Sequence, residues 1–314
     1  DLRLGLTRLL TSCGARVPDA AQGAIFVMLC IGLGIRAPVF PLHSWLPRVL
    51  DQGPVVGASV FLVGIKVGTY GLLRFVIPVL PEAAAEYYWI IALLAGLGML
   101  YGAVIALVQT NLRRLLAYAS LSHMGVVLLG MFSLNLYGLQ GALLQMLSLG
   151  MAMAGLFFIA GFLYSRVGPP EIAVMGGLRQ RVPLMSMAFL VTALAAIGMP
   201  GTSGFNGEHL VLIGAYKVHW SMALCVGAGT VLAASYFLWF YQRAFLGAEA
   251  TTDGAAPLPD LRGRERVIAL TMTGLVFVVG LYTSPFVNVI NGSVTAISEH
   301  VQTRLDAARV ASNR

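Results

Sequence analysis

Long apolar stretches alternate with short polar segments along almost the whole chain. Each stretch is close to or above the ~20 residues that a helix needs to cross ~30 Å of hydrocarbon. Because lipid offers the backbone no hydrogen-bond partners, such stretches must be helical. The pattern predicts an all-α integral membrane protein of about eight transmembrane helices, at residues 21–43, 54–79, 88–109, 115–132, 138–164, 184–215, 221–244 and 267–287.

Two of these helices are expected to be discontinuous. Pro38 and Pro41 interrupt the first, and the run Gly198-Met-Pro-Gly-Thr-Ser-Gly-Phe-Asn-Gly-Glu208 interrupts the sixth. Proline removes a backbone donor and glycine loosens a helix. Broken helices inside a membrane are tolerated where protein or a wet cavity surrounds them, and transporters use them for ion sites. The alternative is that the two prolines simply end a helix.

The pattern divides the chain into three parts. We expect a polar surface segment at 1–19, a transmembrane bundle at 20–287 and a peripheral tail at 288–314. The tail is mildly amphipathic and is expected to lie at the membrane interface or to dock on a partner. No basic segment with a cleavage site precedes the first helix, so we expect no signal peptide.

Composition supports a membrane protein and excludes several other classes. Of 314 residues, 58% are hydrophobic and 11% charged, whereas soluble domains carry roughly a quarter charged residues. The formal charge of +7 does not indicate nucleic-acid binding, because the basic residues lie at helix ends and form no stripe with aromatic residues. Neither a nucleotide-binding motif nor a cysteine or metal-ligand spacing is present, so we predict no cofactor and no metal.

The basic residues predict an orientation in the membrane. One set of alternate connections holds Arg48, Arg113, Arg114, Arg166, Arg179, Arg181, Arg243, Arg262, Arg264 and Arg266, and the other set holds Arg74 and Lys217. By the positive-inside rule, the first set is cytoplasmic. Residue 1 is therefore expected on the outer side.

Two ionisable residues lie deep within predicted helices. Lys66 is near the centre of its span, where inserting a lysine into the membrane costs roughly +2.5 to +3.5 kcal/mol of free energy. It is therefore expected to face the bundle interior rather than to reach the interface. Glu208 follows the glycine-rich break, where a half-helix N-terminus stabilises its anion and burial favours its protonated form. The alternative for Glu208 is a helix cap at the membrane surface.

Two further residues are weaker candidates. His123 follows Ser120 and Ser122 in the fourth span, and imidazole exchanges protons near neutral pH, although a lone histidine is often a packing residue. Arg36 ends the first apolar run beside Pro38. Its guanidinium stays charged, so it serves as a fixed charge or as an interfacial anchor. We expect these four residues to meet in a polar path through the bundle.

Several motifs together resemble the antiporter-like membrane subunits of respiratory complex I. They are Pro41-Leu-His-Ser-Trp-Leu-Pro47, Lys66-Val-Gly-Thr-Tyr-Gly-Leu-Leu-Arg-Phe75, Gln109-Thr-Asn-Leu-Arg-Arg-Leu-Leu-Ala-Tyr-Ala-Ser-Leu-Ser-His-Met-Gly125, Met175-Gly-Gly-Leu178 and the glycine-rich break. The resemblance covers nearly all of residues 20–285. It implies a piece equivalent to the last eight of fourteen helices.

This resemblance implies proton translocation, driven by electron transfer from NADH to quinone elsewhere in a complex of membrane subunits. Lys66 matches the eighth-helix lysine of the family, His123 the tenth-helix histidine and Glu208 the glutamate of the broken twelfth helix. Arg36 stands where the family has a lysine, and Leu149 where it has a histidine. The loop Pro47-Arg-Val-Leu-Asp-Gln-Gly-Pro54 replaces the usual pattern.

We therefore predict a proton-translocating subunit without a redox cofactor, in a bacterial inner membrane. The relay residues are Lys66, His123 and Glu208, with Arg36 as a fixed or gating charge. Alternatives are the same fold in a cation/proton antiporter, a membrane-bound hydrogenase or an inorganic-carbon uptake complex, or a structural subunit without transport. An intramembrane enzyme is disfavoured, because no nucleophile and base pair is apparent.

Overall fold

The computed structural model describes residues 19–169, 172, 175–247 and 258–312, and this part of the chain is helical without strands. The segment 1–18 lies outside it. The helices are α2 (Asp19–Arg36), α3 (Trp45–Gln52), α4 (Val55–Gly64), α5 (Lys66–Gly71), η1 (Leu72–Val76), α6 (Ile77–Val79), α7 (Pro81–Leu107), α8 (Leu112–Met131), α9 (Leu136–Val167), α10 (Leu178–Arg181), α11 (Pro183–Ile197), α12 (Ser203–Val218), α13 (Trp220–Phe245), α14 (Gly263–Leu281) and α15 (Thr283–Ser312).

The predicted all-α membrane class is confirmed. Five helical segments of the described chain are long and apolar enough to cross a membrane: Val55–Val79, Pro81–Leu107, Leu112–Met131, Leu136–Val167 and Trp220–Phe245. The pair α14 and α15 passes the same test together but bends by 67°, which makes up to six. The expected number of eight spans stays a prediction, because α2, α11 and α12 are short pieces.

Both predicted breaks are present. α2 ends at Arg36, and the turn that follows contains Pro38 and Pro41, so the first helix is shorter than the expected 21–43. α11 ends at Ile197 and α12 begins at Ser203. Between them Gly198 and Gly201 have φ angles of 85° and 87°, a left-handed conformation that glycine adopts without strain.

A third irregularity was not predicted. The segment Val55–Val79 is interrupted at Ile65, between α4 and α5, and it continues as the π-helix η1. Single π-helical turns inside α-helices often occur at functional sites. Here the π-helix begins six residues after Lys66, on the same span.

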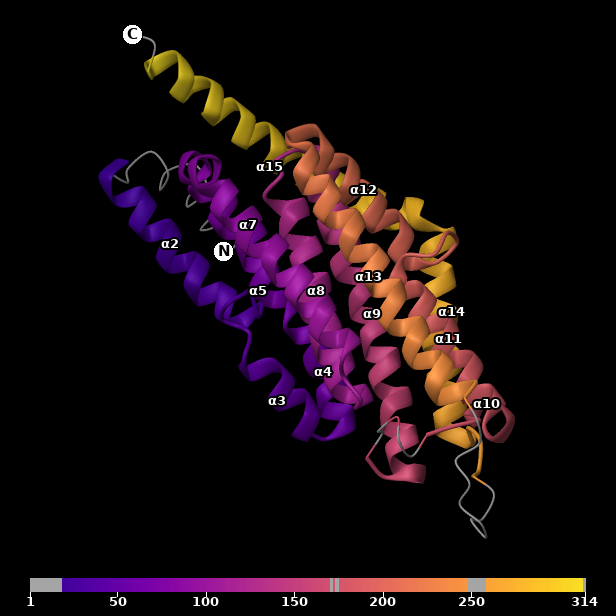
Figure 1. Ribbon diagram of the computed structural model, residues 1–314. Helices are drawn as coiled ribbons and strands as arrows, with labels where there is room; N and C mark the ends of the chain where they lie inside the picture. The colour runs from indigo at the N-terminus through magenta and orange to yellow at the C-terminus, as the bar shows by residue number, and fades with distance from the viewer. Residues whose placement is uncertain (1–18, 170–171, 173–174, 248–257, 313–314) are drawn as a thin grey trace, which may run out of the picture.

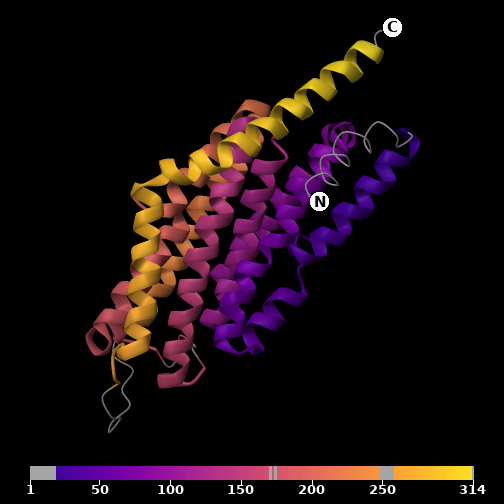
Figure 2. The same ribbon diagram turned by 180° about the vertical axis from the view of Figure 1, so that it is seen from behind.

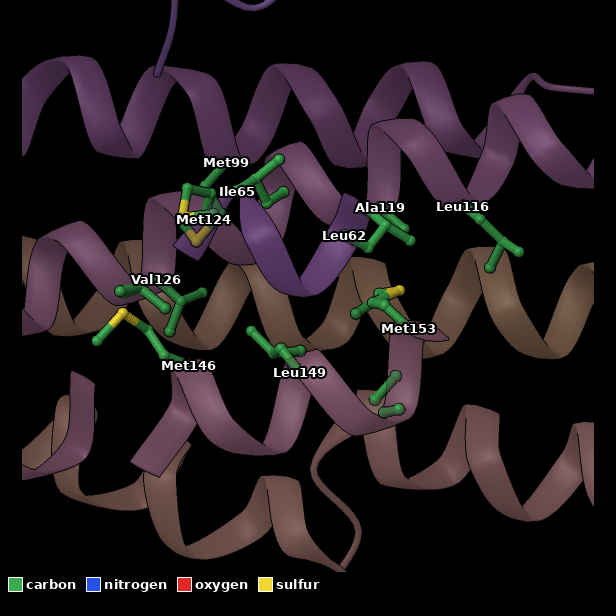
Figure 3. Close-up of a cluster of buried hydrophobic side chains, with 14 of the residues drawn as sticks. Leu62, Ile65, Met99, Leu116, Ala119, Met124, Val126, Met146, Leu149 and Met153 are labelled. Atoms are coloured by element: carbon green, nitrogen blue, oxygen red, sulfur yellow. The ribbon is translucent and has the colours of Figure 1, made fainter. Parts of the chain in front are cut away.

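The helices form an elongated bundle with α8 and α9 near its centre (Figures 1 and 2). Nearly every residue of α8 is buried. α2 and α3 line one edge of the bundle, and α14 lines the opposite edge. Apolar side chains of α4, α7, α8 and α9 meet in the core, including Leu62, Met99, Met124 and Leu149 (Figure 3).

Glycines allow α9 and α12 to pack backbone to backbone. A Cβ atom at Gly141 would lie 2.5 Å from the backbone nitrogen of Val211, and one at Gly214 would lie 2.5 Å from Gly138. Small residues are the usual means by which membrane helices approach closely. We call this contact the α9–α12 seam.

α15 crosses one end of the bundle and extends beyond it (Figures 1 and 2). Val294, Ile297 and Val301 on one face are buried. His300 Nε2 lies 3.1 Å from the carbonyl oxygen of Pro78. Part of the predicted tail therefore packs on the bundle of its own chain, and the division into three parts stays a prediction.

Candidate functional site

Lys66 is the first residue of α5, directly after the break in its span. Its side chain is partly buried, and its ammonium group donates a hydrogen bond to the carbonyl oxygen of Leu62 at 3.0 Å. The hydroxyl of Thr69 donates to the carbonyl oxygen of Lys66 at 2.8 Å. An ammonium carries three donors, so Lys66 keeps further N–H groups for other partners.

His123 lies in the middle of α8 and is 3% exposed. Its Nε2 atom is 3.2 Å from the hydroxyl of Tyr236 on α13, which is fully buried. A tyrosine hydroxyl both donates and accepts, and so does neutral imidazole. This pair is therefore able to pass a proton in either direction between two helices.

Glu208 lies on α12, one turn after the break, and is 7% exposed. The hydroxyl of Thr230 on α13 donates a hydrogen bond to its carboxylate. A Cβ atom at Gly198 would collide with Oε2 of Glu208, so the carboxylate reaches back to the glycine-rich break. The glutamate is buried, which is not what a surface helix cap would show.

Longer-range electrostatic interactions relate these groups to one another. The charge of Lys66 acts on His123, and that of Glu208 acts on Tyr236, although no hydrogen bond joins either pair in the described part of the chain. Together with the hydrogen bond between His123 and Tyr236, these interactions order the residues as Lys66, His123, Tyr236 and Glu208. We call them, with Thr230, the polar series. Three of the four predicted residues are thus brought together.

Arg36 does not join this series. It is exposed at the end of α2, and its guanidinium carbon lies 5.7 Å from the centre of the Phe61 ring. It makes no ion pair with any residue that the structure describes. A path that contains all four predicted residues is therefore not present among the described contacts, and the role of Arg36 as a fixed charge stays a prediction.

Tyr236 and Thr230 could not be selected from the sequence, because α13 is a predominantly apolar helix with several hydroxyl residues and nothing distinguishes these two among them. Gln145 was also missed, although it offered a signal. It is an amide in the first third of the long apolar α9, and it is fully buried. Leu149, one turn further along α9, lies among apolar core side chains (Figure 3).

No three histidine, cysteine, aspartate or glutamate side chains among the described residues come together as metal ligands. Cys30 and Cys225 are both free thiols on different helices. The two ion pairs of the described chain, Arg114 with Asp51 and Arg166 with Glu265, lie away from the polar series.

Comparison with known proteins gives concordant matches. Residues 4–233 match the family described as NADH:quinone oxidoreductase/Mrp antiporter, transmembrane. NADH-quinone oxidoreductase subunit M of Mycobacterium tuberculosis is 36% identical over 282 residues, which are 88% of this chain and 51% of that protein. The chain thus spans about half the length of the curated relatives that it matches. The motifs quoted above resemble subunit M, in agreement with this relative.

Solved structures show the same fold. A chain of respiratory complex I from Thermus thermophilus with bound NADH matches with a TM-score of 0.85 and 34% identity, over 95% of this chain and 65% of that chain. A chain of the Mrp complex from Dietzia matches with a TM-score of 0.77 over 96% of this chain and 64% of that chain. At 20% identity, the second match supports the fold alone.

Proposed function

Because the chain belongs to the NADH:quinone oxidoreductase/Mrp antiporter transmembrane family, we propose that it acts in a proton-translocating membrane subunit of a complex I-type NADH-quinone oxidoreductase. Electron transfer elsewhere in the complex drives the proton movement, and this chain binds no redox cofactor. The observation that carries the proposal is the polar series, which links ionisable side chains of α5, α8 and α12 through a tyrosine of α13.

Each member of the polar series has a defined task. The ammonium of Lys66 gives a proton to a neighbouring acceptor and its amine takes one back. His123 and Tyr236 exchange a proton through their hydrogen bond. Glu208 receives it as a carboxylate, and the Thr230 hydroxyl holds that carboxylate in place. His123, Tyr236 and Glu208 are each less than a tenth exposed. Bulk water therefore cannot take up the proton during these steps.

The proposed setting is a bacterial inner membrane, with residue 1 on the outer side. The ends of α7 and α9 nearest Arg113 and Arg166 then lie in the cytoplasm, as the positive-inside rule favours. The partners are other membrane subunits of the complex. Arg36, exposed on α2, acts as a fixed charge that influences the series from the edge of the bundle rather than as a proton carrier.

The test is proton translocation by the assembled complex. The variants Lys66→Ala and Glu208→Gln should lower the protons moved per NADH oxidised, while the complex remains assembled. Lys217→Ala and Glu299→Gln are matched controls, because Lys217 stacks on the Tyr137 ring and Glu299 is exposed on α15. Both controls should translocate protons as the unaltered complex does.

The rival functions give different results. Unchanged translocation in the assembled Lys66→Ala and Glu208→Gln complexes would refute the relay and favour a structural subunit. Purification of the chain with its partners separates the assemblies, because NADH-dehydrogenase subunits should be present only in a complex I-type enzyme. Translocation that requires Na⁺ in place of H⁺ would point to a cation/proton antiporter.

A further inference from the structure

A groove between α7 and α13 opens on the surface of the bundle. Its volume is about 340 Å³, within the roughly 300–1,000 Å³ that is typical of ligand pockets. Its lining residues include Trp89, Leu93 and Leu97 of α7 and Met222 and Cys225 of α13. The three α7 side chains are exposed, and both helices are long and apolar enough to cross a membrane. This feature, which we call the α7–α13 groove, therefore opens toward the hydrocarbon of the membrane.

The groove is open space rather than a close helix contact. A Cβ atom at Gly96, which lines it, would meet only Sγ of Cys225 within 4 Å, at an ordinary contact distance of 3.6 Å. By contrast, a Cβ atom at Gly229 would lie 2.5 Å from Sδ of Met99, where the same two helices pack closely. Gly96 thus leaves room between α7 and α13 for something else. Both pairs advance together along the chain, so the two helices run in parallel.

The length of the groove matches one lipid acyl chain. Its lining extends along α7 from Tyr88 to Leu100, which is a rise of about 18 Å along the helix. The hydrocarbon core of a bilayer is ~30 Å thick, so the acyl chains of one leaflet cover about 15 Å of it. An acyl chain of a single leaflet therefore fits the groove from end to end.

The two ends of the groove differ in polarity. One end is lined by His219 and Ser221, where α13 begins, and by Trp89 of α7. The other end is lined by Leu100 and Leu129. Tryptophan is enriched where a membrane meets water, so the polar end is expected at the level of the lipid head groups. A molecule with a polar head and an apolar chain fits this arrangement.

The polar end is suited to a phosphate group. Nδ1 of His219 accepts a hydrogen bond from the backbone N–H of Ser221 at 3.3 Å, so the neutral ring donates through Nε2. The first turn of α13 adds the partial positive charge of a helix N-terminus. Lys217 adds a cation nearby, although its ammonium is engaged with a tyrosine ring. Glu82 and Glu86 of α7 line the cavity on the α2 side instead, and no carboxylate of the described chain lines this groove.

We propose that the α7–α13 groove binds a phospholipid, with one acyl chain along α7 and the phosphate at the start of α13. Nε2 of His219 donates to a phosphate oxygen, and hydrogen bonds to ionised acceptors are among the stronger ones. The acyl chain packs on Leu93 and Leu97. This binding requires no proton transfer, so it goes beyond the proposed function and is tested separately from it.

The first measurement is photocrosslinking of the unaltered, assembled complex in phosphatidylcholine vesicles. The probe is a phosphatidylcholine that carries a diazirine on one acyl chain, and mass spectrometry locates the residues that it labels. We expect the labelling to be concentrated at Leu93, Leu97 and Cys225. Labelling spread evenly over the exposed faces of α7 and α14 would overturn the proposal. Labelling confined to a partner subunit that covers the groove would overturn it as well.

The second measurement fills the groove. Gly96→Leu places a side chain in the open space beside Cys225 and should reduce the labelling of Cys225 severalfold. Gly274→Leu is the matched control, because Gly274 is exposed on α14 and a Cβ atom there would meet nothing within 4 Å. This control should be labelled as the unaltered complex is. If Gly96→Leu fails to assemble, Gly96→Val, a smaller change, gives the decisive reading. Unchanged labelling in the assembled variant would overturn the proposal.

The third measurement tests the position of the phosphate. A diacylglycerol with the same diazirine chain lacks the phosphate, so it should label the groove severalfold less than the phosphatidylcholine probe does. His219→Ala should remove this difference, because Nε2 is the proposed donor. Equal labelling by the two probes in the unaltered complex would overturn phosphate binding at the start of α13.

Discussion

The hydrogen bond between His123 and Tyr236 makes a sharp quantitative prediction. Tyr236→Phe removes one oxygen atom and leaves the ring in place. Since the two residues are 3% and 0% exposed, no bulk water replaces the lost hydroxyl. The Nε2 atom of His123 is then buried without its partner, which costs about 1–3 kcal/mol. The folded protein should therefore lose about 1–3 kcal/mol of stability. Because phenylalanine can neither donate nor accept a proton, transfer between His123 and residue 236 should also stop.

The assay is NADH-driven proton uptake into vesicles that contain the assembled complex, with NADH oxidation followed in parallel. Tyr241→Phe is the matched control on the same helix, because its hydroxyl lies 3.0 Å from that of Ser186 and outside the polar series. Proton uptake should fall in Tyr236→Phe only. If both variants pump at the rate of the unaltered complex, transfer between His123 and Tyr236 plays no part in the pathway.

Three further outcomes follow from contacts described above. Thr230→Val removes the donor to the Glu208 carboxylate and should lower proton uptake, whereas Thr230→Ser should retain it; equal loss in both would contradict the contact's role. Gly141→Ala forces α9 away from α12 and should destabilise the protein by about 1–3 kcal/mol, seen as a lower midpoint of thermal unfolding. Arg166→Ala leaves Glu265 without its partner and should lower that midpoint without changing proton uptake; reduced uptake at normal stability would contradict a purely structural pair.

The breaks in the helices could be predicted because their causes are local. Pro38 and Pro41 forbid a regular helix, and the glycines around residue 200 permit left-handed backbone. The interruption at Ile65 and the π-helix after it have a weaker signal, because the segment around Lys66 contains no proline and its glycines, Gly64, Gly68 and Gly71, loosen a helix without fixing where it breaks. Tertiary packing decides it.

The candidate site could be predicted only where a charge was out of place. Lys66, His123 and Glu208 stand out because ionisable groups are costly in lipid. Periodicity could not show which residues meet, because a helix in a membrane bundle is apolar toward lipid and toward its neighbours alike. For the same reason Arg36 was grouped with the others, although it is exposed at the end of α2.

α13 supplies the partners of two ionisable residues and carries neither of them. Thr230 and Tyr236 are six residues apart, a rise of about 9 Å along the helix, and they meet Glu208 of α12 and His123 of α8. The distance between the Glu208 carboxyl and the His123 imidazole is thus set by α13, which has no charged side chain between Thr230 and Tyr236. A catalogue of acidic and basic residues in the bundle core would leave Thr230 and Tyr236 out, although a one-residue insertion between them would uncouple Glu208 and His123 at once.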